Sequence, residues 1–258
     1  MAATFPAAMT TSIRLHVRAP LAAGAAVDCG TAQSRYLRTV MRRSTGDAVL
    51  LFNGEDGEWQ ATIETAARDS MRLICRRRTR PQDVAPDVWL AFALLKRDAT
   101  DLAVRQATEL GVARIMPVLT DHGQAARVNT DRLLAIIIEA AEQSERLTLP
   151  ALSPPVTLTD LLAAWPGDRQ LLAAIERLGS RALPAMVGPP CGLLVGPEGG
   201  FSARERAQLL RHPAVRALSL GSCVLRAETA IVAGLAQLLC SGTDDGTAAP
   251  LPSSAGDR

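Results

Sequence analysis

Two short loops hold the residues whose types and spacing could do chemistry. The first is Gly196-Pro197-Glu198-Gly199-Gly200, and the second begins at Leu220-Gly221 and leads to Arg226 and Glu228. Glycine lets the backbone approach a ligand closely, so its N–H and C=O groups can hydrogen-bond an adenine ring or a carboxylate. An arginine beside such a loop could stabilise a developing anion, although a structural Arg–Glu salt bridge has the same spacing. Together the two loops predict one small-molecule pocket.

Other common kinds of site find less support in the sequence. A plain strand-to-helix turn remains an alternative for an isolated Gly-rich loop. Leu95-Lys96-Arg97-Asp98 follows the first strand of the expected α/β region, where a dinucleotide site would need G-x-G-x-x-G. Lys96 is the only lysine and follows a leucine, which excludes a P-loop, and no G-x-S-x-G elbow is present. The cysteines and histidines lack metal-ligand spacing, so we expect free thiols and no metal.

Alternating strands and helices from Val88 onward must position the two loops. Apolar runs predict strands at 88–94, 114–119, 170–175, 193–195 and 216–220, and apolar periodicity predicts helices at 98–110, 130–146 and 226–240. Ser202 and Glu205 have the spacing of a capping box that starts one more helix. Ligands of open α/β sheets bind outside the carboxyl ends of the strands, which is where both loops lie.

Residues 12–80 read as a small β-rich domain with one short helix. Strands are expected at 12–17, 48–52, 58–63 and 70–75, and the helix at 34–43. Arg35, Arg38 and Arg42 fall at i, i+3 and i+7 of that helix, which suits either a solvated basic face or a surface that tracks RNA phosphates. The first 86 residues hold 12 arginines against 8 acidic residues, so the basic excess is N-terminal.

These patterns divide the chain into five segments. They are a flexible N-terminus at 1–11, the β-rich domain at 12–80, a linker at 81–87, the α/β domain at 88–240 and a disordered tail at 241–258. No apolar run is long enough to span a bilayer, and the first residues lack the features of a secretory signal. We therefore expect a cytoplasmic protein without a membrane partner.

The two loops belong to a wider set of motifs. Leu194–Glu205 matches L-x-G-P-E-G-G-x-S-x-x-E, and Leu220–Ala230 matches most of L-G-P-R-I-L-R-x-E-T-A. Further motifs lie at 36–42, 51–54, 106–112 and 139–146, the last reading E-A-A-E-Q-S-x-R. Across about residues 13–240 the chain thus resembles the RsmE-like family, the 16S rRNA uracil-N3 methyltransferases of the SPOUT class.

The resemblance implies a fold and a function that residue patterns alone do not predict. The implied fold is α/β, with a SPOUT-type parallel sheet and a C-terminal trefoil knot, preceded by a small PUA-like β-barrel domain. The implied reaction is S-adenosylmethionine-dependent methylation of N3 of a specific uridine in 16S rRNA of the small ribosomal subunit. The family acts as a homodimer whose partner completes each pocket, and the small residues of the final helix fit such close packing.

The resemblance also assigns roles to residues. Arg226 would stabilise the uracil anion that forms when the N3 proton is lost, and Glu228 would orient Arg226, while no general base can be named. Residues implied to bind the cofactor are Glu176, Gly196, Pro197, Glu198, Gly199, Gly200, Leu220, Gly221, Ser222, Val224, Leu225 and Thr229. Residues expected to contact RNA are Arg14, Arg35, Arg38, Arg42, Gln143 and Arg146.

The chain departs from the family pattern at three places. Ser222-Cys223 replaces a Pro-Arg pair, Gln106 replaces a lysine, and Asp121-His122-Gly123 stands where the family has a Thr/Arg/Ser loop. The loss of a cation beside the pocket keeps open an RNA-binding ribosome-assembly factor without catalysis. A SPOUT methyltransferase for tRNA or for a ribose 2′-OH is opposed only by the resemblance of the N-terminal domain.

Overall fold

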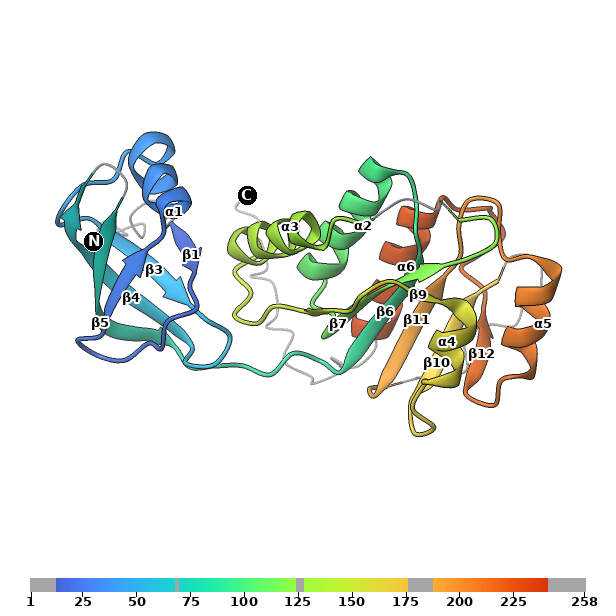
Figure 1. Cartoon of the computed structure of the whole chain (residues 1–258). Helices are drawn as coiled ribbons and strands as arrows, with labels where there is room; N and C mark the ends of the chain where they lie inside the picture. Colours follow the sequence, from blue (N-terminus) through green and yellow to red (C-terminus); the bar gives the residue numbers. More distant parts are fainter. Residues whose placement is uncertain (1–12, 68–69, 124–127, 176–187, 241–258) are drawn as a thin grey trace, which may run out of the picture.

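The computed structural model describes residues 13–67, 70–123, 128–175 and 188–240, which form two domains joined by an extended segment (Figure 1). The N-terminal domain contains β1 (Arg14–His16), β2 (Ala26–Cys29), α1 (Thr31–Arg35), the π-helix η1 (Tyr36–Val40), β3 (Ala48–Phe52), β4 (Glu58–Ala66) and β5 (Met71–Arg80). Its sheet has the order β1-β3-β4-β5-β2, parallel between β1 and β3 and antiparallel elsewhere. The sequence pattern does not predict β2, a strand of four residues.

Alternating side chains on one face of this sheet form a hydrophobic core that belongs to the N-terminal domain alone. Leu15, Val49, Leu51 and Leu73 are each almost fully buried, and they belong to one cluster within the N-terminal domain. Leu37 of η1 covers that cluster and is also fully buried. The described residues thus form the small β-rich domain that the sequence predicts, and residues 81–87 after it contain no helix or strand.

The basic helix differs from its prediction. The α-helix ends at Arg35, and the chain continues as a π-helix only to Val40 instead of remaining α-helical to residue 43. A π-helix bonds i to i+5, so it shifts the following side chains around the axis. Arg42 lies beyond the helix end with φ 52°. Arg35, Arg38 and Arg42 therefore do not share the continuous helical face that their spacing predicts.

The C-terminal domain is built on a parallel sheet. Its elements are β6 (Val88–Ala93), α2 (Arg97–Glu109), β7 (Arg114–Leu119), α3 (Thr130–Gln143), β8 (Ala151–Leu152), β9 (Val156–Thr157), α4 (Leu158–Ala163), β10 (Gln170–Ala174), β11 (Cys191–Val195), α5 (Ala203–Arg211), β12 (Val215–Leu218) and α6 (Ala227–Cys240). Among the described residues the sheet order is β12-β10-β11-β6-β7-β8, with β9 also beside β7, and all pairs are parallel. The expected strands and helices agree with these elements to within a few residues.

Helices cover both faces of this sheet. The side chains of a strand alternate between the two faces, so each strand contributes apolar residues to both. Leu90 of β6 and Leu193 of β11 pack with α2, α3 and α6 in one cluster. Ala91 and Leu194, their neighbours in sequence, pack with α4 and α5 in another. The strands are apolar on both sides for this reason, as the continuous run from Val88 predicts.

Candidate functional site

A cavity of about 520 Å³ opens at the carboxyl ends of three neighbouring strands, β10, β11 and β12. Ala174, Val195 and Leu218 end these strands, and all three line the cavity. The remaining wall comes from the loops that follow the strands, from Arg206 of α5 and from Ala227 and Ala230 of α6. This is the position at which open α/β sheets bind their ligands.

Both loops singled out in the sequence line this cavity. The residues of the predicted cofactor set found in its wall are Gly196, Pro197, Glu198, Gly199, Gly200, Leu220, Gly221, Ser222, Val224 and Leu225. Thr229 is not among the lining residues, and Glu176 lies outside the described residues. The two loops therefore form one pocket, as their placement after parallel strands predicts.

Both loops depend on glycine for their path around the cavity. A Cβ atom on Gly196 would lie 3.0 Å from Cε2 of Phe201, which is tighter than ordinary carbon packing. Phe201 cannot easily give way, because it is 7% exposed and belongs to the cluster under α4 and α5. In the second loop Gly221 has φ 113°, a conformation that residues with a Cβ rarely adopt.

A buried carboxylate fastens the first loop to a distant segment of the chain. Glu205 is 1% exposed, and its two oxygens accept hydrogen bonds from the backbone N–H groups of Ser202 at 2.9 Å and Asp121 at 2.8 Å. The Ser202 hydroxyl donates to the Asp121 carboxylate at 2.6 Å, and this bond holds the pKa of Asp121 below its ordinary value. His122 Nδ1 lies 3.1 Å from the carbonyl oxygen of Gly200. One of the departures from the family pattern thus contacts the glycine loop directly.

Glu205→Gln is expected to lower the free energy of unfolding by about 1–3 kcal/mol. The amide NH₂ of glutamine replaces one accepting oxygen and faces a backbone N–H, so one partly buried donor loses its partner. Thermal denaturation measures the loss, and Glu55→Gln is the matched control because Glu55 is exposed. Equal melting temperatures for the two variants would show that the Glu205 carboxylate does not hold the loop.

The predicted catalytic residues stand at the edge of the cavity. Arg226 is exposed between the lining residues Leu225 and Ala227, and its carbonyl accepts the first-turn hydrogen bond of α6 from the N–H of Ala230 at 2.8 Å. No ion pair joins Arg226 to Glu228 in the described structure, and the orienting role of Glu228 stays a prediction. Residues two apart at a helix start point in different directions, which explains the absence of that pair.

Most residues expected to contact RNA are exposed. Arg35, Arg38 and Arg42 lie on the surface of the N-terminal domain, and Gln143 lies on the surface at the end of α3. Their exposure is compatible with RNA contact, and that role remains a prediction for these four residues.

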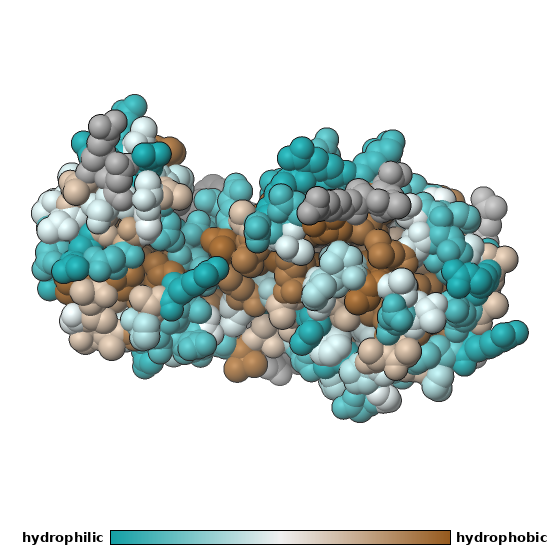
Figure 2. Space-filling model, viewed as in Figure 1, coloured by the Kyte–Doolittle hydropathy of each residue, from teal (hydrophilic) through white to brown (hydrophobic). Residues whose placement is uncertain are grey.

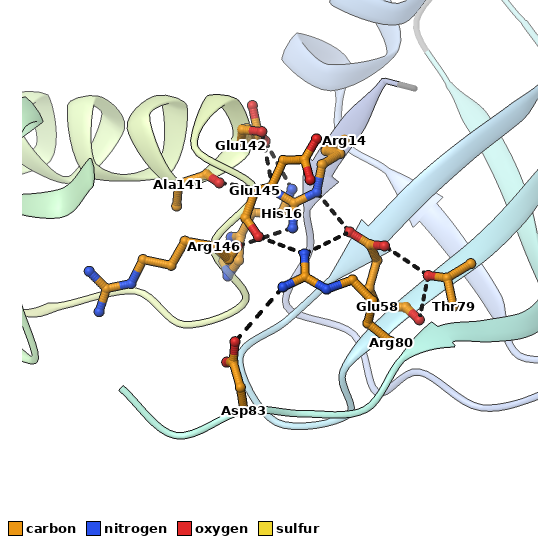
Figure 3. A network of polar contacts seen from close by, with 10 residues as sticks. All are labelled: Arg14, His16, Glu58, Thr79, Arg80, Asp83, Ala141, Glu142, Glu145 and Arg146. Carbon is orange, nitrogen blue, oxygen red and sulfur yellow. Dashed lines mark hydrogen bonds and ion pairs between the residues drawn. The ribbon is translucent and has the colours of Figure 1, made fainter. Parts of the chain in front are cut away.

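Two residues expected to contact RNA are instead engaged inside the protein. Arg14 is 7% exposed, and its Nε lies 2.7 Å from the carboxylate of Glu58 (Figure 3). Arg146 donates to the carbonyl oxygens of Thr108 at 2.9 Å and Val112 at 2.6 Å, and burial lowers its pKa to about 10. Both guanidinium groups are thus hydrogen-bonded to protein oxygens, which argues against RNA contact, and the RNA-binding role of Arg14 and Arg146 stays an untested prediction.

The cavity also contains residues that the sequence analysis does not select. Arg206, Ile175, Phe201 and Ser219 all line it. Arg206 had a usable signal, since it lies four positions after the capping residue Ser202 and so returns to the same side of α5. Ile175 and Ser219 carry no distinctive pattern and are found only through the strand ends that they follow.

Other kinds of site are absent from the described part of the chain. No group of three His, Cys, Asp or Glu residues there could hold a metal ion. Cys29, Cys75, Cys191 and Cys223 are free thiols. None of the described helices combines the length and apolar character that crossing a membrane requires.

Both domains match known protein families. Residues 82–239 match the RNA methyltransferase domain, and residues 30–74 match the RNA methyltransferase PUA domain. The ribosomal RNA small subunit methyltransferase E of Rickettsia conorii is 32% identical over 236 residues, which cover 89% of this chain and 96% of that protein. The protein of the same name from Synechocystis is 32% identical over 222 residues, which cover 83% of this chain and 73% of that protein.

Solved structures agree with these matches. A putative methyltransferase from Legionella pneumophila, in complex with bound cofactor SAM, has a TM-score of 0.81 and 28% identity, covering 89% of this chain and 98% of that one. The ribosomal RNA small subunit methyltransferase E of Neisseria gonorrhoeae, bound to S-adenosyl methionine, has a TM-score of 0.79 and 26% identity, covering 87% and 95%. The chain therefore belongs to the RNA methyltransferase family that includes the ribosomal RNA small subunit methyltransferases E.

Proposed function

We propose that this protein methylates N3 of a specific uridine in 16S rRNA, with S-adenosylmethionine (SAM) as methyl donor. The observation that carries the proposal is the cavity built from two glycine loops at the ends of β11 and β12. The similar Legionella and Neisseria structures contain SAM, and the Rickettsia relative is a small-subunit rRNA methyltransferase. Membership of the same family supports the same cofactor and class of substrate here.

The cavity suits SAM in size and in the groups that it offers. Its volume of about 520 Å³ falls within the roughly 300–1,000 Å³ typical of small-molecule sites. Ile175, Leu220 and Leu225 supply an apolar wall for the adenine ring, and Arg206 supplies a cation for the carboxylate. A Cβ on Gly196 would press against the ring of Phe201, so glycine at this position lets the loop keep its path along the cavity wall.

The residues at the cavity edge would act on the RNA base. Bound SAM supplies a methyl group on a sulfonium, which is already a good leaving group. The uracil N3–H must lose its proton before or during methyl transfer, and Arg226 would stabilise the resulting anion. The target base must leave its stack to reach the cavity, because N3 lies on the Watson–Crick edge. Positioning of the base against the pocket therefore supplies most of the acceleration.

The N-terminal domain would hold the RNA. It matches an RNA methyltransferase PUA domain, and Arg35, Arg38 and Arg42 are exposed on it. Guanidinium groups suit phosphate contacts, and Gln143 lies on the surface at the end of α3. We include these four residues in the proposed RNA surface, and the rRNA substrate implies that the protein works in the cytoplasm.

A second copy of the chain would complete each pocket. Val224 is 67% exposed although it is apolar and lines the cavity. Val232, Ala233 and Ala236 of the neighbouring α6 are also partly exposed. An exposed apolar patch beside a pocket is typical of an interaction surface. A homodimer would cover this patch.

Reverse transcription tests the proposed reaction directly. Small ribosomal subunits from a strain that lacks the gene are incubated with the protein and SAM, and the 16S rRNA is then copied. N3-methyluridine cannot form a Watson–Crick pair, so we expect one new stop that depends on both SAM and protein. Labelled methyl on tRNA with no stop on rRNA would favour the tRNA alternative. Binding to the subunit without any methyl transfer would favour a non-catalytic assembly factor.

A further inference from the structure

One arginine of the N-terminal domain is built into the end of a helix of the C-terminal domain. Arg14 in β1 has a side chain that is 4% exposed, and its Nε pairs with Glu58 Oε2 at 2.7 Å. Its Nη1 donates to the carbonyl oxygens of Ala141 at 2.9 Å and Glu142 at 3.1 Å, and its Nη2 donates to that of Arg146 at 3.1 Å. Figure 3 shows this guanidinium between the two domains. Every partner across the boundary belongs to α3 or to the turn after it.

The end of α3 has a physical need for such a donor. The last carbonyls of a helix lack partners within the helix and carry partial negative charge. The chain turns there through Glu145, which has φ 58°, and the N–H of Arg146 returns to the carbonyl of Ala141 at 3.2 Å. A planar guanidinium spreads five N–H donors over a rigid fork, whereas an ammonium group has three donors on a single nitrogen. Arg14 thus caps, from another domain, a helix that has no basic residue in its own last turn.

A second arginine carries the connection deeper into the C-terminal domain. Arg146 donates from Nη1 to the carbonyl of Thr108 at 2.9 Å and from Nη2 to that of Val112 at 2.6 Å. Thr108 lies in the last turn of α2, so two arginines in series cap two helices. α2 packs against α6, whose first residues Ala227 and Ala230 line the cavity. The chain of contacts therefore runs from β1 to the helix that borders the pocket.

Further contacts on either side of Arg14 restrict rotation of one domain relative to the other. The N–H of His16 donates to Glu142 Oε1 at 2.9 Å, and Arg80 donates to the carbonyl of Glu145 at 2.8 Å. Burial raises the pKa of Glu142. Phe52 is fully buried in a small cluster with Ala141 and Leu147 of the other domain. In Figure 2 hydrophobic residues lie on both sides of the boundary between the domains.

We propose that Arg14 is a positioning residue for the methyl transfer. It fixes the orientation of the N-terminal domain, so that RNA held there presents its target base to the cavity. The E-A-A-E-Q-S-x-R motif, which supplies Glu142 and Arg146, then serves as the domain joint. The consequence for activity rests on the proposed function, whereas the fixed orientation does not.

The test removes both members of the buried pair. Arg14→Met alone would leave the buried charge of Glu58 without its partner, which is costly. The variant that alters the domain joint, called the joint variant below, is therefore Arg14→Met combined with Glu58→Gln. The matched control is Arg72→Met with Asp28→Asn, which makes the same change at an ion pair whose side chains are 49% and 61% exposed. Arg14→Lys keeps the charge beside Glu58 but has no fork to bridge the helix end. It provides a second variant in which the N-terminal core retains its ion pair.

Distances between the domains report the orientation without reference to activity. Spin labels are placed at Val40→Cys and Leu210→Cys, which are 64% and 57% exposed, with Cys223 and Cys240 changed to Ser. We expect the electron–electron distance distribution to broaden in the joint variant and in Arg14→Lys, and to keep the parent width in the control. A folded joint variant with the parent width would overturn the proposal.

Kinetics then separate positioning from binding. On small ribosomal subunits we expect kcat of the joint variant to fall on the order of tenfold to a hundredfold, as displacement of a reacting group by about 1 Å does. The dissociation constants for SAM and for RNA should stay within about twofold, because neither surface is changed. An unchanged kcat, or a loss explained wholly by weaker RNA binding, would contradict the positioning role. A wild-type protein that methylates no RNA would refute the proposed function, while the distance measurement would still decide on the joint.

Discussion

Arg226→Ala is expected to lower kcat for methyl transfer by a factor on the order of 10²–10³, the usual cost of losing one preorganised donor to a developing anion. Arg226 is exposed at the start of α6 between two residues of the cavity wall. Within the described residues no carboxylate lies within ion-pair distance of it, so its guanidinium is available to a substrate. SAM affinity should change by less than about threefold, because Arg226 does not line the cavity.

The pH dependence of the variant gives a sharper test of the role of Arg226. If the arginine stabilises the uracil anion, the rate of the alanine variant should recover in part at high pH, because solvent then ionises N3–H. Arg226→Lys should retain part of the activity, since it keeps the charge without the fork. Arg211→Ala, an exposed arginine at the end of α5, is the control. Wild-type activity of Arg226→Ala at all pH values would make the residue structural.

The pocket could be predicted from the sequence because its determinants are local. The glycines at 196–200 and 221, the apolar strands before them and the Ser202–Glu205 capping box are each visible within about ten residues. Parallel strands place their carboxyl ends together, so local patterns were enough to bring the two loops into one site. The structure adds Arg206 and Phe201, whose contribution depends on how α5 leaves the loop.

The joint between the domains could not be predicted in this way. Arg14 on a short strand has the same local pattern whether it faces solvent or the carbonyl of Ala141, a residue 127 positions away. The carbonyl oxygens that accept from Arg14 cannot be identified from the sequence, because every residue type has a backbone carbonyl. The π-helix that displaces Arg42 also cannot be predicted from the sequence, since it preserves apolar spacing over one turn. The trefoil knot implied by the resemblance stays a prediction, because hydrophobic periodicity does not record how a chain is threaded.

The second large effect is expected at Gly196. Gly196→Val should weaken SAM binding by roughly 5- to 150-fold, which corresponds to the about 1–3 kcal/mol typical of an overpacked site. A Cβ there would lie 3.0 Å from the ring of Phe201, and valine adds two more methyl groups. Because Phe201 is 7% exposed in a packed cluster, the loop must yield instead and narrow the cavity. Isothermal titration with SAM measures the change.

Two variants distinguish this steric effect from general loss of stability. Gly167→Val is the control, because nothing lies within 4 Å of a Cβ at Gly167, and it should bind SAM as the parent does. Phe201→Leu added to Gly196→Val removes the ring that the new side chain strikes, so it should restore most of the lost affinity. Affinity that stays low after the ring is removed would mean that glycine at 196 is needed for ligand contact itself. The narrowing of the cavity would then be the wrong explanation.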